Sequence, residues 1–404
     1  MDSLSWSEPQ WMGRVIEAFP VLPLLFDGLI SFHIPWLQYL VSQPWHVNIC
    51  GSQQHVAGME KFSQYRDRGS GIAPFLPIPT EASGIALPFH IFLFTFRVPL
   101  LLTVTSFYFL FLQWLPLGPL AKKAALWVIL GVPGIWWVDL QIDGVKKGSL
   151  AQNARRLPSP GTIIASSSAS PIDALYLAAI FDPVFTASYP STRLVQPITL
   201  FQAILRAFLP PQETPHPNAR LVNLQTMLAE YPNQPIVVFP ECTTTNGKGI
   251  LPFAPSLLTA PRNTKVFPVS LRYTAPDITT PIPASFGTFL WNLCSKPTHC
   301  IRVRIAEAVY RTSTAPSESG PAVKTSSYKT NFFDTMQQDT ASNGETLVAE
   351  DTHSPGSLNK EERVFLDKVA DALARLGRVK RVGLGVREKQ HFVQSWTKSR
   401  SRRR

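Results

Sequence analysis

The longest apolar run of the chain limits what this sequence can fold into. Residues 87–115 contain one charged residue, Arg97, and none follows it within the run. A helix needs about 20 apolar residues to cross about 30 Å of hydrocarbon, so this run approaches the length of a membrane span. A helix of such composition also occurs buried in protein cores, and the run alone allows both structures.

A second apolar run lies at residues 124–138, directly after Lys122 and Lys123. It is short for a full crossing and contains Pro133 and Gly134, which favours an element that re-enters the membrane or lies in its interface. Indole side chains prefer the headgroup region, and four lie near the ends of the two runs: Trp114, Trp127, Trp136 and Trp137. We therefore predict a hydrophobic membrane hairpin over residues 87–140.

The positive charge of the chain is concentrated in one segment. Charged residues make up 16% of the chain, below the roughly 25% of ordinary soluble domains, yet the net charge is +11. Residues 378–404 carry +9 of it, since they hold ten Lys or Arg and one acid, Glu388. Such a tail attracts polyanions or simply stays solvated. No nucleic-acid-binding motif accompanies it, so we expect anionic lipid headgroups, not nucleic acid, as its partner.

Cysteine usage indicates neither disulfides nor a metal site. The four cysteines, in a chain of 404 residues, do not make a disulfide framework. Cys294 and Cys300 flank His299 but lack the short C-x2-4-C spacing of zinc sites. We therefore expect reduced thiols facing the cytosol and no bound metal.

After residue 160 the pattern is typical of an α/β domain. Short β-branched or alternating runs predict strands at residues 162–165, 235–239, 266–271 and 300–305. Apolar periodicity predicts helices between them, at residues 174–181 and 219–231. Strands that alternate with helices indicate a mixed, mainly parallel sheet covered by helices, over residues 141–311.

The flanking segments differ from this domain. We predict an N-terminal extension at residues 1–58, a loop segment at 59–86 and a disordered, Ser/Thr-rich insertion at 312–357. Residues 358–404 are predicted to hold a docking helix and the basic tail. Asn359 and Glu362 have capping-box spacing at the start of that helix, and its apolar stripe is Leu366, Val369, Leu373 and Leu376, before Gly377.

The segment at residues 237–251, VVFPECTTTNGKGIL, carries polar groups directly after a predicted buried strand. Ligands in α/β folds bind at such strand ends. Threonine hydroxyls, including those of Thr243 and Thr244, can bind a phosphate together with Lys248, while Glu241 can accept a hydrogen bond. A glycine turn whose threonines satisfy the backbone is the alternative.

This segment resembles the F-P-E-G-T block of the glycerolipid acyltransferase superfamily, and FPECTTTNGKGILPF is similar to its fungal lysophosphatidic acid:oleoyl-CoA acyltransferase branch. The resemblance implies that Glu241, Thr243, Thr244 and Lys248 bind the phosphate and glycerol end of the acceptor. Two positions depart from the pattern. Cys242 replaces the glycine, and Thr244 replaces the usual arginine, which leaves Lys248 as the cation of the block.

The catalytic block of the same superfamily is N-H-x4-D, in which the histidine takes a proton from the acceptor hydroxyl and the aspartate orients its ring. Residues 167–173 resemble it, with Asp173 at the aspartate position and Ser168 at the histidine position. A serine hydroxyl is no base near neutral pH. Three outcomes stay open: Asp173 acts directly or through water, His216 or His90 enters the site, or the protein binds lipid without turnover. The hypothesis that Ser168 forms an acyl-enzyme has less support than these three, because no Ser-His pair is visible nearby.

Weaker likenesses extend the resemblance along the chain. Residues 181–186 lie where the superfamily has its second acceptor-binding block, and residues 266–269 resemble the fourth, which borders the acyl pocket. Residues 59–77 resemble the opening of the fungal branch. This predicts that residues 1–58 have no role in catalysis and leaves open whether the native protein carries them.

The resemblance implies an enzyme that moves a fatty acyl group from acyl-CoA to a lysophospholipid, with lysophosphatidic acid as the expected acceptor. Acyl-CoA is a co-substrate, and no cofactor is expected. The predicted hairpin would seat the domain on the cytosolic side of the endoplasmic reticulum membrane or a lipid droplet. The alternative is a catalytically silent acyltransferase fold that binds lipid in trafficking or lipid-droplet homeostasis.

Overall fold

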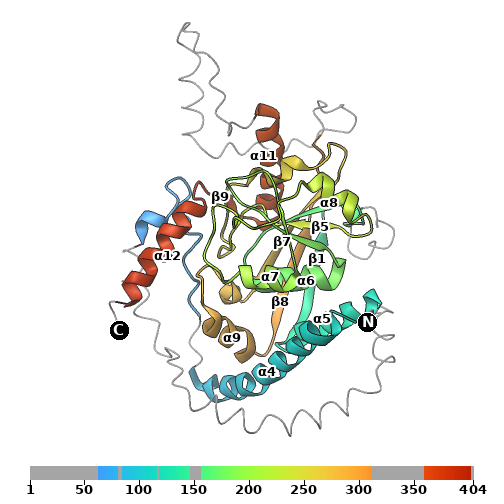
Figure 1. The fold of residues 1–404 in the computed structure, drawn as a ribbon. Helices are drawn as coiled ribbons and strands as arrows, with labels where there is room; N and C mark the ends of the chain where they lie inside the picture. Colours follow the sequence, from blue (N-terminus) through green and yellow to red (C-terminus); the bar gives the residue numbers. More distant parts are fainter. Residues whose placement is uncertain (1–61, 81–83, 116–117, 146–155, 312–358, 402–404) are drawn as a thin grey trace, which may run out of the picture.

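A computed structural model describes residues 62–80, 84–115, 118–145, 156–311 and 359–401. The predicted N-terminal extension at 1–58 and the predicted insertion at 312–357 lie outside the described residues. The described part forms one large sheet with helices around it, and a separate pair of short strands (Figure 1).

The described residues form a seven-stranded sheet in the order β1-β8-β7-β2-β5-β3-β4. Pairing is parallel for β1/β8, β7/β2, β2/β5 and β5/β3 and antiparallel for β7/β8 and β3/β4, which confirms a mixed, mainly parallel sheet. The strands are β1 Ile135–Ile142, β2 Ile163–Ser166, β3 Val184–Ala187, β4 Gln196–Ile198, β5 Ile236–Val238, β7 Val266–Thr274 and β8 His299–Ile305. Gly249–Ile250 (β6) and Lys380–Arg381 (β9) pair separately.

The two faces of the sheet bury alternate residues of the same strands, as the two-residue period of a strand requires. Ile164 and Val237 belong to one buried cluster, whereas Ile163 and Ile236 belong to the other. Each is fully buried, which contributes about 1.5–3 kcal/mol per side chain. The central strands are therefore mostly apolar, because both of their faces are covered.

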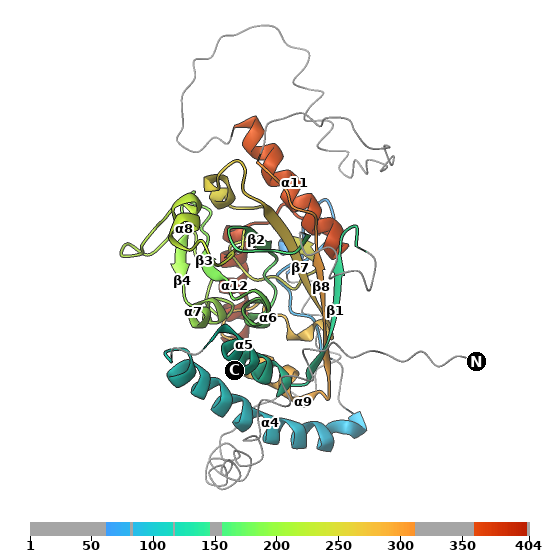
Figure 2. The ribbon, with the colours of Figure 1, turned by 90° about the vertical axis from the view of Figure 1, so that its right-hand side faces the viewer.

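Different helices cover the two faces (Figures 1 and 2). The cluster with Ile164 includes side chains of α5 Pro119–Gly131, α6 Pro171–Phe181 and α9 Phe286–Ser295, with α7 Leu200–Arg206 packed beside α6. The cluster with Ile163 includes side chains of α8 Leu224–Glu230 and α11 Lys360–Gly377. The prediction of a helix over residues 219–231 was partly wrong, because Val222 pairs with Val195 in a β-bridge and the helix starts after it.

The first apolar run forms helix α4, Leu87–Phe107, which continues through a π-helical turn at Tyr108–Leu112. Together with the short η2 helix Gly84–Ala86, it is the one helix of the described residues long and apolar enough to cross a membrane. Of the 18 most apolar consecutive residues of this helix, only 17% are buried. It lies along the edge of the domain near α9 (Figures 1 and 2).

The second apolar run does not form a single helix. Its first part lies in α5, and the chain then turns at Gly134, where φ is +89°, into strand β1. The boundary predicted between residues 140 and 141 therefore cuts β1, which starts at Ile135 and pairs along its length with β8. Trp136 and Trp137 nevertheless remain exposed, by 65% and 70%. The strand was missed because its apolar start merges with the preceding helix.

Arg97, the one charge of the apolar run, attaches α4 to the domain. Its guanidinium donates to the carbonyl oxygens of Pro133, Lys296 and Pro297, the last at 2.9 Å. Two of these carbonyls lie just after α9. Gly134 also approaches this point so closely that a Cβ there would meet the Pro297 oxygen at 2.5 Å. The arginine is therefore a structural cation, and it links α4 to α9.

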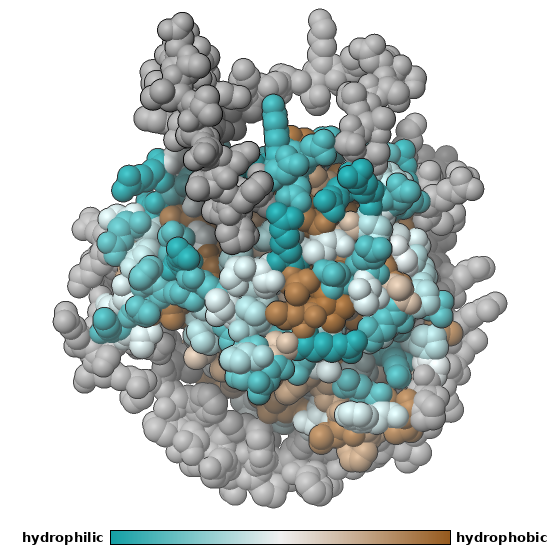
Figure 3. Space-filling view, turned by 45° about the horizontal axis from the view of Figure 1, so that its top comes forward, coloured by the Kyte–Doolittle hydropathy of each residue, from teal (hydrophilic) through white to brown (hydrophobic). Residues whose placement is uncertain are grey.

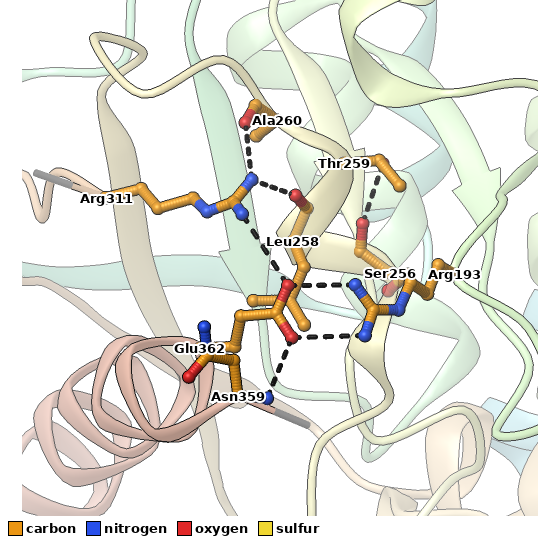
Figure 4. Close-up of polar contacts among 8 residues, drawn as sticks. All are labelled: Arg193, Ser256, Leu258, Thr259, Ala260, Arg311, Asn359 and Glu362. Atoms are coloured by element: carbon orange, nitrogen blue, oxygen red, sulfur yellow. Dashed lines mark hydrogen bonds and ion pairs between the residues drawn. The ribbon is translucent and has the colours of Figure 1, made fainter. Parts of the chain in front are cut away.

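The predicted docking helix is confirmed as α11, with its capping box and apolar stripe in place. Figure 4 shows how the start of this helix is held. The Glu362 carboxylate accepts from the Asn359 backbone N–H at 3.2 Å and from both terminal nitrogens of Arg193, and it forms an ion pair with Arg311 at 3.7 Å. Pairing with two arginines adds long-range contacts to a local cap.

Within the segment predicted to hold the basic tail, residues 358–404, the structure has a further helix, α12, Val386–Ser401. Phe392 is fully buried, and its ring lies 5.3 to 6.1 Å from those of Phe62, Tyr65, Phe75 and Trp396. The predicted loop segment thus packs against α12. Besides η2, the described residues form three short 3₁₀ helices: η1 Ser63–Tyr65, η5 Pro255–Thr259 and η6 Pro276–Ile278.

Candidate active site

Two loops that leave neighbouring strands form the site. Strands β2 and β5 pair in parallel, so their carboxyl ends lie at the same edge of the sheet. The loop after β2 holds Ser168, and the loop after β5 holds the F-P-E-C-T segment. The backbone N–H of Thr245 donates to the Ser168 carbonyl oxygen at 3.0 Å. The two blocks that the sequence singled out are therefore in contact.

Asp173 holds the loop after β2 in place. Its carboxylate accepts from the backbone N–H groups of Ala169 and Ser170, at 2.7 and 2.9 Å, and from the hydroxyl of Tyr273 on β7. The Ser170 hydroxyl completes the capping box of α6 and donates to the Ile278 carbonyl at 2.9 Å. Burial raises the pKa of Asp173 to about 6, although the three donors favour its charged form.

Glu241 lies behind the second loop and is 1% exposed. Its Oε2 accepts from the backbone N–H of Leu251 at 3.1 Å. Burial raises the pKa of Glu241 to about 8, although the backbone N–H groups of Leu251 and Ser168 lower it. Of the nearby charges, that of Asp173 raises this pKa and that of Lys389 lowers it. The carboxyl group is therefore mainly protonated at neutral pH and fixes the shape of the turn.

Cys242 explains why the related block has glycine at this place. Its φ is +58°, in the left-handed region that costs a residue with a side chain about 1–2 kcal/mol. The Cys242 sulfur lies 3.6 Å from the Pro240 carbonyl oxygen, so the side chain turns back onto its own loop. The backbone keeps the glycine-like turn although the residue differs.

A buried lysine from α12 holds the two threonines of the segment. The Lys389 ammonium, 1% exposed, donates to Thr243 Oγ1 at 2.8 Å, to the Thr244 carbonyl at 2.6 Å and to Thr244 Oγ1 at 3.1 Å. Thr244 in turn donates to the Thr280 carbonyl at 2.6 Å. Burial lowers the pKa of Lys389 to about 7. Lys248, by contrast, has an exposed side chain.

A cavity of about 50 Å³, enough for several water molecules, opens between the two loops. Ser168, Cys242, Thr243 and Thr244 line it, while Asp173, Glu241 and Lys248 do not. Its walls also include Phe239, Thr186 and Arg206. The structure thus divides the predicted site residues into a group that faces the cavity and a group that shapes the loops.

No histidine lines this cavity, all of whose lining residues are described. His216 is exposed in the connection between α7 and α8, and His90 lies on α4. His299 is buried in β8, where its Nε2 lies 2.8 Å from the Leu293 carbonyl oxygen. The described histidines therefore give no imidazole beside Ser168.

Sequence reasoning missed Arg206 and Lys389. Arg206 follows an unremarkable helical pattern, and Lys389 was counted with the tail charges. Neither carries a local signal, because each reaches the site through the packing of its helix. Together the loops nevertheless define a class: a strand–loop–helix block with a capped aspartate beside an F-P-E-C-T turn resembles the glycerolipid acyltransferases.

Comparison with curated proteins confirms this resemblance. The chain is 28% identical over 233 residues to a Schizosaccharomyces pombe protein provisionally named lysophosphatidic acid:oleoyl-CoA acyltransferase. The aligned region covers 56% of this chain and 77% of the relative. It is 26% identical over 200 residues to lysophosphatidic acid:oleoyl-CoA acyltransferase 1 of Saccharomyces cerevisiae, which covers 48% of this chain and 61% of the relative. No family model matches the chain.

Lys389→Met should destabilise the protein by about 1–3 kcal/mol, because it leaves the Thr244 carbonyl without its donor in a buried place. Thermal unfolding followed by circular dichroism measures the effect. Lys398→Met, at an exposed position of the same helix, is the matched control and should change the midpoint little. Equal effects of the two substitutions would show that the buried ammonium does not hold the turn.

Glu241→Gln should alter how stability depends on pH. The folded-state pKa of about 8 lies above the ordinary 4.5, so the folded chain keeps a proton that the unfolded chain releases. This contribution to stability is complete below about pH 4.5 and is lost as the pH rises to about 8. Urea unfolding at both ends of this range should show that the free energy of unfolding falls less in the variant than in wild type as the pH rises. Glu361→Gln, at an exposed position of α11, is the control and should keep the wild-type dependence of stability on pH. If the stability of Glu241→Gln varies with pH in the same way as that of wild type, the raised pKa of Glu241 is contradicted.

Proposed function

We propose that the chain is an acyl-CoA-dependent lysophospholipid acyltransferase that converts lysophosphatidic acid to phosphatidic acid. The observation that carries the proposal is the contact of the Ser168 loop with the F-P-E-C-T turn around one cavity. Both loops resemble blocks of the acyltransferase superfamily, and both curated relatives are named for lysophosphatidic acid and oleoyl-CoA.

In this reaction the free hydroxyl of the acceptor attacks the thioester carbonyl of acyl-CoA. A C–O bond forms, the C–S bond breaks, and CoA leaves as a thiol once it takes up the hydroxyl proton. Ser168 and Thr243 line the cavity, and both carry hydroxyls that can hydrogen-bond to the acceptor. Asp173 remains a candidate base through water, although its carboxylate is already bound by three donors. No cofactor or metal takes part in the proposed reaction.

A catalytically silent, lipid-binding protein is the second candidate, because Ser168 stands where a general base is expected. General-base assistance contributes about 10²–10⁴-fold to a rate. The two candidates therefore differ in whether the wild-type chain turns over at all.

Purified full-length protein should transfer the acyl group of oleoyl-CoA to lysophosphatidic acid, measured as thiol release and as phosphatidic acid formed. We expect Ser168→His to raise kcat by about 10²-fold, since it supplies the missing base. Ser168→Ala should lower activity only modestly, because the serine orients but does not take the proton. If wild type transfers no acyl group to any lysophospholipid and Ser168→His creates the activity, the silent protein is the correct description.

We further propose that the active domain sits on the cytosolic face of the endoplasmic reticulum membrane or a lipid droplet. Support comes from the exposed large side chains of α4 and the segment after it, among them Phe92, Phe96, Phe107, Phe111 and Trp114. In Figure 3 apolar side chains gather near the centre of the view and again at its lower right, among hydrophilic ones. Anionic headgroups are the proposed partners of the basic residues at 378–404.

The double variant Phe107→Asp/Phe111→Asp should lose sedimentation with vesicles of phosphatidylcholine and phosphatidylserine, because both side chains are more than half exposed on the proposed membrane side. Val364→Asp, on α11 at the other end of the molecule, is the control and should still sediment (Figure 1). Vesicle binding that survives in the double variant would rule out this surface as the anchor.

A further inference from the structure

One charged side chain lies in the wall of the cavity, and the proposed function has not used it. Of the residues that line the cavity, all described, Arg206 alone is charged. It ends helix α7, which packs against α6 beside the Ser168 loop. A cation in the wall of this cavity can attract an anionic group of a ligand.

The guanidinium of Arg206 is held by a tyrosine and not by a carboxylate. Its carbon lies 4.8 Å from the centre of the Tyr189 ring, and its Nη1 donates to the Tyr189 hydroxyl at 2.9 Å. That hydroxyl donates to the Gln196 side chain at 2.6 Å, and Tyr189 is 2% exposed. Among the ion pairs of the described residues, none includes Arg206. The cation is thus oriented but not neutralised.

The polar residues of the cavity wall can bind an anion with several oxygens together with Arg206. Ser168 and Thr243 line it together with Arg206, and the Thr243 hydroxyl, which accepts from Lys389, still has a proton to donate. The arginine is close enough to Cys242 for its charge to lower the pKa of that thiol, against burial, which raises it to about 12. Hydroxyl donors together with a guanidinium fork are the groups that bind phosphate oxygens in proteins.

The other two cations near the turn are not available for this role. Lys389 donates to Thr243 and Thr244 from behind the turn, and it does not line the cavity. Lys248 is exposed and also lies outside the cavity wall. Thr244 stands where the related block carries an arginine, so the turn itself supplies no cation to the cavity.

We propose that Arg206, positioned by Tyr189, binds the phosphate of the lysophospholipid acceptor in place of the arginine that the F-P-E-C-T turn lacks. The inference rests on the proposed function, since it names the group that selects the acceptor at the same site. It makes the protein selective for acceptors with a terminal phosphate. The phosphates of CoA are the competing source of the same chemistry.

Steady-state kinetics of the full chain test the assignment. Arg206→Met should raise KM for lysophosphatidic acid about 10- to 100-fold, because a hydrogen bond to a charged group contributes about 1.5–3 kcal/mol. KM for oleoyl-CoA should stay at the wild-type value. Arg206→Lys, which keeps the charge and loses the fork, should give an intermediate KM. Tyr189→Phe removes the positioning hydroxyl and should raise KM less than Arg206→Met does, with kcat little changed.

Controls separate this role from a structural one. Arg220→Met, which removes an exposed arginine paired with Glu230, should leave both KM values unchanged. If Arg206→Met fails to fold, Arg206→Lys still reports the split between the two KM values. An unchanged KM for lysophosphatidic acid in both variants overturns the proposal, and so does a rise confined to oleoyl-CoA, which would assign Arg206 to the donor.

A binding measurement keeps the inference distinct from the proposed reaction. Calorimetric titration with a short-chain lysophosphatidic acid needs no turnover, and Arg206→Met should weaken its affinity about 10- to 100-fold. Wild-type binding that depends on Arg206, without acyl transfer, would retain the phosphate site and reject the proposed activity. Binding that is equal in wild type and Arg206→Met would reject the phosphate site, whatever the activity.

Discussion

The hydrogen bonds of one buried ammonium group, that of Lys389, are the constraint on which the arrangement of the site depends. A buried cation needs partners, and Thr243 and Thr244 supply three acceptor atoms. Helix α12 must therefore stay against the turn. Phe392, one helical turn further along, packs against Phe62 and Phe75, so the segment before α4 is held as well. Helix α12 thus joins three distant parts of the chain, the turn through a polar contact and the segment before α4 through an aromatic one.

In each loop, some residues fix the shape of the backbone and others line the cavity. Asp173 and Glu241 are nearly inaccessible and accept backbone N–H groups, whereas Ser168 and Thr243 face the cavity. In a catalytic block of this kind the aspartate orients an imidazole. Here it bonds to Tyr273 instead, and the tyrosine hydroxyl satisfies a carboxylate that would otherwise be buried with fewer donors. The loop can therefore keep its shape without a histidine.

Features with local causes could be predicted from the sequence. The runs at β2, β5 and β7 predicted strands because they are short and rich in β-branched residues, and β8 did so by alternating buried and more exposed residues. Asn359 with Glu362 predicted the start of α11. Strand β1 and helix α12 could not be predicted in this way. The first follows an apolar helix without a polar break, and the second has a charge pattern that resembles a solvated tail. Arg206 and Lys389 act through tertiary packing, which leaves no mark in the neighbouring sequence.

The position of Lys389 along the chain also affects how the protein is made. Domains tend to fold as they emerge during synthesis, with the N-terminal parts first. The sheet strands and both loops precede residue 312, yet the turn gains its buried partner only from α12. A nascent chain that has released the whole sheet therefore still has an unfinished site. Ribosome-bound intermediates that end before α12 should therefore hold the strands of the sheet while the turn still lacks its buried partner.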